Sequence, residues 1–122
     1  MNLPLISEGA KKSGILWLDL DRPRLAWHIW HDGAIYLVTG GGEQSLPGLA
    51  GTDRVRVTLR SKDNGGELVA FDATVEVVDQ TSDSGAVAAL AKERLNAPDG
   101  AGLIVRWARE SAVLRLTPLA AD

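Results

Sequence analysis

Residues 25–44 read LAWHIWHDGAIYLVTGGGEQ, and this stretch predicts two strands joined by a tight turn. In residues 25–30 both alternating sets are apolar enough to favour a strand that is covered on its two faces. Asp32-Gly33 is a dipeptide that two-residue hairpin turns prefer, because both central positions need a positive φ. Residues 34–39 are β-branched and aromatic, and the run stops at three consecutive glycines, so the sequence predicts a β-hairpin.

The glycine run, Gly40 to Gly42, has two interpretations. Glycines at the end of a buried strand leave backbone N–H groups uncovered, so that an anion or a flat ligand can approach closely. Equally, glycine often marks a flexible connector between elements. No Lys-Ser or Lys-Thr follows at the spacing of a Walker phosphate loop, and a dinucleotide fingerprint needs spaced glycines that open a helix. Both interpretations stay open.

Length and composition limit the class of protein. A chain of 122 residues fits one domain with a single core, and we expect a short N-terminal arm over residues 1–13, which can include one helical turn, before a domain over 14–122. A net charge of -3 argues against nucleic acid as a partner. No apolar run approaches the ~18 residues that cross a bilayer, and no signal peptide is evident, so we expect no membrane contact and a cytoplasmic protein. The lack of cysteine excludes thiol catalysis and disulfides.

The rest of the chain is predicted to be rich in strands. Alternating apolar residues predict strands over 14–20, 53–61, 68–78, 102–108 and 112–117, with a turn at 62–66 and a single helical turn within 45–51. Ser82-Asp83-Ser84 offers an N-cap for one helix that ends near Asn96. Many short strands with one clear α-helix predict a mainly β fold, a small antiparallel barrel, because closing the sheet removes exposed edges.

Candidate metal-ligating and catalytic groups are few. His28 and His31 are three apart on a predicted strand and point to opposite faces, so they cannot hold one ion together, and we predict no metal site. Asp19 and Asp21 have the spacing of a carboxylate pair but also that of a solvated strand end. No Gly-x-Ser-x-Gly motif supports a hydrolase. No catalytic residue is assigned.

Aromatic and basic residues offer candidate ligand contacts. The four tryptophans all fall on predicted strands, where large rings either fill a small barrel or form the wall of a slot for a planar ligand; Trp30 is the best candidate for the second role. Arg56 and Arg60 share one face of a strand. They either protect a sheet edge by charge or bind a phosphate or carboxylate through their guanidinium groups.

Residues 30–39, WHDGAIYLVT, resemble the W-D-G-x-I-Y-L-x-T hairpin of the pyridoxamine 5'-phosphate oxidase-like family of FMN-binding split β-barrels, including its actinobacterial flavin and deazaflavin oxidoreductase branch. The resemblance in layout covers roughly residues 14–118 and implies a split β-barrel, an FMN or deazaflavin cofactor, and a homodimer with the cofactor between subunits. It also implies that Thr39, Gly41 and Gln44 lie near the cofactor phosphate and that residues 25–30 pass along the isoalloxazine ring. Where the family commonly has Ser, Arg or Lys after the threonine, this chain has Gly-Gly-Gly-Glu-Gln, and Glu43 would repel a phosphate.

Two functional hypotheses follow. In the first, the protein is a flavin- or deazaflavin-binding oxidoreductase that acts on a small molecule. Trp30 and His28 then line the site, Thr39 and the glycine amides meet the ligand tail, and Arg56 or Arg60 neutralises it. In the second, a cofactor-free dimeric barrel serves as a binding or structural module, since a scaffold does not fix its function.

Overall fold

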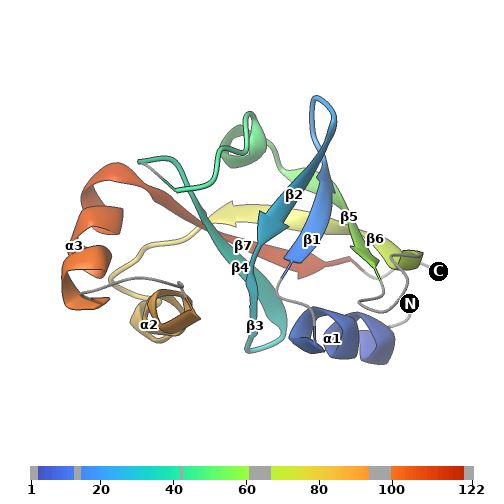
Figure 1. The fold of residues 1–122 in the computed structure, drawn as a ribbon, viewed down its shortest axis with the longest axis horizontal. Helices are drawn as coiled ribbons and strands as arrows, with labels where there is room; N and C mark the ends of the chain where they lie inside the picture. Colours follow the sequence, from blue (N-terminus) through green and yellow to red (C-terminus); the bar gives the residue numbers. More distant parts are fainter. Residues whose placement is uncertain (1–2, 13–14, 42, 61–66, 94–99, 120–122) are drawn as a thin grey trace.

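The computed structural model describes residues 3–12, 15–41, 43–60, 67–93 and 100–119 (Figure 1). The strands are β1 (Ile15–Asp19), β2 (Pro23–Trp27), β3 (Ile29–His31), β4 (Ala34–Thr39), β5 (Arg54–Arg60), β6 (Glu67–Val77) and β7 (Ala112–Pro118). The helices are α1 (Leu3–Lys12), α2 (Ser84–Glu93) and α3 (Gly100–Glu110), with a short 3-10 turn, η1 (Leu49–Gly51).

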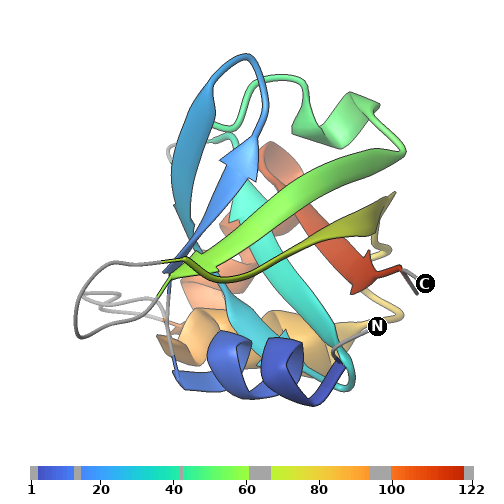
Figure 2. The same cartoon turned by 90° about the vertical axis from the view of Figure 1, so that its right-hand side faces the viewer.

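The strands form one curled antiparallel sheet in the order β2-β1-β5-β6-β7-β4-β3. β2 and β3 lie at opposite ends of this order, yet only His28 separates them along the chain, so the sheet curls to bring its two ends together (Figure 2). The predicted fold class, a mainly β split barrel, is therefore confirmed. The strand predicted over residues 25–30 is present as two pieces, because the chain breaks at His28.

The predicted hairpin is also confirmed. β3 pairs with β4 from Ile29 opposite Tyr36 to His31 opposite Ala34. The two turn residues adopt the positive φ angles that the Asp-Gly dipeptide favours, 52° at Asp32 and 82° at Gly33.

Two hydrophobic cores share strand β4, whose six residues are all buried. Because side chains alternate along a strand, Ile35 and Leu37 face the barrel interior together with Ile6 and Leu114. The opposite side of β4 packs against α2 and α3 in a second core, which contains Tyr36, Val38, Leu90, Leu103 and Trp107. β4 therefore contributes side chains to the barrel core on one face and to the core beneath α2 and α3 on the other.

The prediction of a strand over residues 102–108 is wrong, because this segment lies in helix α3. Leu103 and Trp107 are four residues apart and both are buried, whereas Val105 is 58% exposed. That burial pattern follows the helical repeat, and packing against the second core outweighs the local preference of the apolar run for a strand. Trp107 is accordingly a core residue of a helix.

The N-terminal segment forms the ten-residue helix α1, which is longer than the arm with one turn that the sequence predicts. Ile6 and Ala10 are four residues apart on α1 and are 1% and 2% exposed, and their burial against the barrel stabilises the helix. Within the described residues the structure therefore has three α-helices, where the sequence predicts one clear helix.

The remaining predicted elements agree with the structure. β1, β5, β6, β7, η1 and α2 lie where the sequence places them. The turn predicted at 62–66 and the end of the helix near Asn96 lie outside the described residues. Across the residues that the structure describes, none of the helices is both long enough and apolar enough to pass through a membrane.

Candidate functional site

A pocket of about 380 Å³ lies where α1, β3 and α2 meet. Figure 1 shows α1 and α2 at the same end of the molecule, on either side of β3. The pocket is lined by Ala10, Lys11, His28, Ile29, Trp30, Ala89, Lys92 and Glu93. Small-molecule sites usually have volumes of about 300–1,000 Å³, so this pocket is large enough for a small ligand.

His28 forms the buried polar part of the pocket wall. It is 4% exposed, and its Nε2 lies 3.0 Å from the carbonyl oxygen of Ala10. Since a carbonyl oxygen only accepts, Nε2 carries the proton and donates. Burial lowers the pKa of His28 to about 4, so the ring is neutral at pH 7 and Nδ1 is an unprotonated acceptor. Nδ1 is buried and has no hydrogen-bond partner among the residues that the structure describes.

The rim of the pocket combines one indole with charged groups. Trp30 is half-buried and packs against the barrel core. Ala89 and Lys92 are three residues apart on α2 and therefore share a face of that helix. Lys11 approaches from α1, directly after Ala10. Lys11, Lys92 and Glu93 are exposed, and within the described residues neither lysine forms an ion pair.

The loop after β4 is closed by its own hydrogen bonds. Thr39 Oγ1 donates to the carbonyl of Gln44 at 2.8 Å, and the N–H of Gly40 donates to the same oxygen at 3.3 Å. The N–H of Glu43 donates to the carbonyl of Gly40 at 3.0 Å. Thus two of the loop's backbone donors and the Thr39 hydroxyl are already bonded within the loop.

The start of β7 and the end of α3 pack directly on this loop. A Cβ placed on Gly41 would lie 2.6 Å from the carbonyl oxygen of Glu110, and the Ser111 hydroxyl donates to the carbonyl of Gly40 at 2.9 Å. The carboxylate of Glu43 is also enclosed: the side chain is 1% exposed and lies 3.3 Å from the guanidinium of Arg106 on α3. Gly41 is required here for close packing as well as for its φ of 59°.

The side chain of Gln44 joins β2 to β4 across the split in the barrel. Its Oε1 accepts from the N–H of Trp27 at 2.9 Å, while its Nε2 donates to the carbonyls of Trp27 and Val38 at 3.0 and 3.1 Å. Without this amide, the N–H and the carbonyl of Trp27, at the end of β2, would each lose a hydrogen bond. Gln44 therefore has a structural role that the sequence does not reveal.

Arg56 and Arg60 lie on the outer face of β5, away from the pocket at α1, β3 and α2. Arg56 is half-exposed and lies 3.4 Å from Asp72. The guanidinium of Arg60 lies 6.0 Å from the centre of the Trp17 ring, within the range of a cation–π contact. A second pocket of about 280 Å³ on this face is lined by Trp17, Asp19, Pro23, Thr58 and Arg60.

The residues predicted for the site therefore fall into three places. His28 and Trp30 lie together in the pocket at α1, β3 and α2; Thr39, Gly41 and Gln44 lie together in the closed loop; and Arg56 and Arg60 lie on the outer face. Asp19 and Asp21 have the spacing of a carboxylate pair, but Asp21 instead accepts a hydrogen bond from the Arg24 guanidinium at 2.7 Å. This guanidinium lowers the pKa of Asp21 to about 2.

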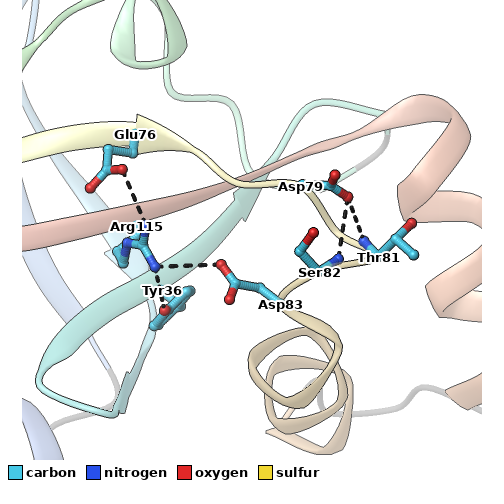
Figure 3. A network of polar contacts seen from close by, with 7 residues as sticks. All are labelled: Tyr36, Glu76, Asp79, Thr81, Ser82, Asp83 and Arg115. Carbon is cyan, nitrogen blue, oxygen red and sulfur yellow. Dashed lines mark hydrogen bonds and ion pairs between the residues drawn. The ribbon is translucent and has the colours of Figure 1, made fainter.

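Sequence reasoning missed the lysines of the pocket and a polar cluster on the far side of β4. Lys11 belongs to a segment predicted as an arm, and the spacing of Ile6 and Ala10 was the signal that could have indicated the helix. The cluster is centred on Arg115, which is the register partner of both Tyr36 and Glu76 (Figure 3). Only strand pairing reveals this arrangement.

Arg115 connects three elements within the cluster. It donates to Tyr36 Oη at 3.3 Å, to Glu76 at 3.1 Å and to Asp83, which directly precedes α2, at 3.5 Å. The hydrogen bond to Glu76 is the main reason why the pKa of Arg115 is raised. With two carboxylates already on its guanidinium, Arg115 is a structural residue and not an open anion site.

Nearby, Asp79 accepts the backbone N–H groups of Thr81 and Ser82 at 2.9 and 3.3 Å and shapes the turn into α2 (Figure 3). These hydrogen bonds lower the pKa of Asp79.

Comparison with solved structures supports the split β-barrel fold, whereas comparison by sequence finds no match. No family model matches the sequence, and no curated protein matches it. Among solved structures, the conserved hypothetical protein Rv2991 from Mycobacterium tuberculosis has a TM-score of 0.68 and 21% identity, over 98% of this chain and 82% of that one. A putative pyridoxamine 5'-phosphate oxidase from Listeria innocua has a TM-score of 0.63 and 16% identity, over 98% and 95%.

The general stress FMN/FAD binding protein from Xanthomonas citri has a TM-score of 0.62 and 17% identity, over 98% of this chain and 85% of that one. At these identities the likeness shows the fold. The resemblance to pyridoxamine 5'-phosphate oxidase-like split barrels is thus confirmed at the level of architecture, and proteins with this architecture include flavin-binding ones.

Proposed function

We propose that this protein binds a flavin or a deazaflavin in the pocket at α1, β3 and α2 and acts as an oxidoreductase on a small molecule. The observation that carries the proposal is the composition of that pocket: a half-buried indole, a neutral imidazole and two cations surround about 380 Å³. Stacking against an indole favours a flat ring by about 0.5–1.5 kcal/mol beyond area burial. The names of the structural neighbours, which include FMN and FAD, support a ligand of this class.

The bound ring would supply the hydride or electron transfer, and the protein would supply position and polarity. Trp30 orients the ring by contact with its face. His28 stays neutral at pH 7 and so offers an acceptor without adding a charge. A phosphate contact at Thr39, Gly41 and Gln44 stays a prediction. A phosphate bound there would compete with the hydrogen bonds inside the loop.

The proposal includes a homodimer formed through the outer face of β1 and β2. Ile15 and Leu25 are 49% and 48% exposed there, beside their register partners Trp27 and Trp17, which are half-buried. The same face carries both signs of charge, with Asp19 opposite Arg56. A two-fold interface brings one patch against itself, so a patch with apolar residues and both charges is self-complementary. In such a dimer Arg56 and Arg60 would lie at the boundary between copies.

Absorbance and titration test the ligand. We expect the protein purified without added ligand to be yellow, or to bind FMN, FAD or a deazaflavin with micromolar affinity by fluorescence. Trp30→Leu should weaken binding at least about tenfold, whereas Val105→Ala, which shortens an exposed apolar side chain of α3 outside the pocket, should not. A colourless protein that binds none of the three ligands would remove the proposal.

Sedimentation tests the dimer. We expect a dimer for the unmodified protein and a monomer for Leu25→Asp. Val77→Asp is the matched control, because Val77 is 59% exposed on β6 and lies outside the proposed interface. A protein that is monomeric before any substitution would contradict this part.

A cofactor-free dimeric module is the second candidate. It is favoured by the buried Glu43 carboxylate beside the glycine loop, since a negative charge there opposes a phosphate. In that case replacing Thr39 or Gly41 changes stability alone, with no ligand effect to lose.

A further inference from the structure

Two exposed lysines from different helices lie at the same pocket. Lys11 comes from α1 and Lys92 from α2, and both line the space above His28 and Trp30. Within the described residues neither ammonium group is ion-paired. Glu93 contributes one negative charge at the rim, so the two lysines leave a net charge of about +1 there. The helices around this pocket therefore attract an anion, although the chain as a whole is acidic.

We propose that Lys11 and Lys92 form the anion-binding end of this pocket, and that its ligand is a planar heterocycle which carries a phosphate or carboxylate and presents an N–H or O–H donor to His28. The identity of the ring rests on the proposed function, but the anion site does not. This assignment places the acidic group of the ligand at α1 and α2, and it is an alternative to the predicted phosphate contact at the glycine loop or at the arginines of β5.

His28 explains why a donor is required. Its Nε2–H is bonded to the carbonyl of Ala10, and this fixes which nitrogen faces away from α1. Nδ1 is left buried with no partner among the described residues, and leaving a buried acceptor unsatisfied destabilises the fold. A ligand donor that bonds to Nδ1 removes this cost, and because Nδ1 is buried in the structure, the groups that cover it must shift to admit the donor. The edge of a flavin or deazaflavin ring has such a donor at N3–H, and the amino group of adenine is another.

The lysines explain why the ligand is an acid. An ammonium group forms charge-assisted hydrogen bonds with phosphate or carboxylate that are roughly twice as strong as neutral ones. Because Lys11 and Lys92 are exposed, this contribution weakens as salt is added. The two arginines that the sequence suggested for binding the acidic group are less available. Arg56 pairs with Asp72, and Arg60 lies over the ring of Trp17.

The test compares ligands that differ only in the phosphate. FMN and riboflavin form one pair, adenosine 5'-monophosphate and adenosine the second, and inorganic phosphate is the probe without a ring. We expect the phosphorylated member of a pair to bind at least about tenfold more tightly by calorimetry. In Lys11→Gln/Lys92→Gln this difference should fall to less than about threefold.

Arg22→Gln/Arg54→Gln is the matched control, because it removes the same charge from exposed positions outside the pocket and should keep the difference. If FMN and riboflavin bind equally, or if the lysine variant keeps the difference, the anion site is wrong while the proposed flavin binding stands. If no flavin and no deazaflavin binds, the proposed function fails, and the anion site then stands only if adenosine 5'-monophosphate or inorganic phosphate binds through the lysines. If FMN, adenosine 5'-monophosphate and inorganic phosphate all fail to bind, the anion site is wrong.

Nitrogen NMR tests the donor. When the ring-bearing ligand binds, the Nδ1 resonance of His28 should move upfield as it accepts a hydrogen bond, while that of His31 stays in place. Binding with an unchanged Nδ1 resonance would overturn the role of His28.

Discussion

His28 Nε2 donates a hydrogen bond to the carbonyl oxygen of Ala10 at 3.0 Å and so joins helix α1 to the point where β2 gives way to β3. The residues are 18 apart in the sequence, and no local rule pairs them. The bond holds α1 over the end of the barrel and forms one side of the pocket. It also makes the stability of this end depend on the protonation of His28.

Stability should fall in mild acid because of His28. Its pKa is lowered from 6.5 to about 4 in the folded protein, so between these values the unfolded chain binds more protons and stability is lost as the pH falls. The contribution is about 3 kcal/mol between pH 7 and pH 4. Urea unfolding at a series of pH values measures it. His28→Gln should flatten the dependence over this window, and an equal slope in His28→Gln would contradict the assignment.

Removal of the Gln44 amide should destabilise the split in the barrel. Gln44→Ala loses three hydrogen bonds to backbone groups of Trp27 and Val38, with an expected cost of about 2–3 kcal/mol in the free energy of unfolding. Gln44→Glu should cost at least as much, since a carboxylate would face two carbonyl oxygens. Ser45→Ala, at the exposed neighbour, is the control. Gln44→Glu as stable as the unmodified protein would show that these donated bonds contribute little.

Two glycines with positive φ should respond differently to alanine. At Gly33 a Cβ meets nothing within 4 Å, so Gly33→Ala carries only the backbone cost of about 1 kcal/mol. At Gly41 the Cβ would lie 2.6 Å from the Glu110 carbonyl, and Gly41→Ala should cost about 1–3 kcal/mol more. Thermal unfolding of both variants tests this. Equal costs would mean that the loop moves away from the end of α3 without loss.

The Arg115 cluster should show measurable coupling across the sheet. A double-mutant cycle of Arg115→Met with Tyr36→Phe is expected to give a coupling of about 1 kcal/mol, because Tyr36 is 4% exposed. The pair Arg56 and Asp72 is the comparison: both side chains are 50% exposed, and its coupling should be below about 0.5 kcal/mol. A larger coupling at the exposed pair would contradict the role of burial.

The sequence predicted elements well where local chemistry decides. The Asp32-Gly33 turn and the alternation along β5 depend on neighbouring residues, and both agree with the structure. It failed at α3, because an apolar, β-branched run is compatible with either a strand or a helix until a second core selects one face. The resemblance assigns the predicted site residues to one cofactor site, but in the structure they lie in three places. Their positions depend on how the barrel closes, which local sequence does not determine.

The sequence by itself therefore determined the hairpin, most strands, helix α2 and the resemblance to a split barrel, since turn chemistry and side-chain alternation act over a few residues. Tertiary structure alone decided that Lys11, His28 and Lys92 share one pocket, that Gln44 bonds to Trp27, and that Arg115 lies between Tyr36 and Glu76. The physical reason is that these contacts join residues distant in the chain. They form only when the curled sheet and its helices bring those residues into contact.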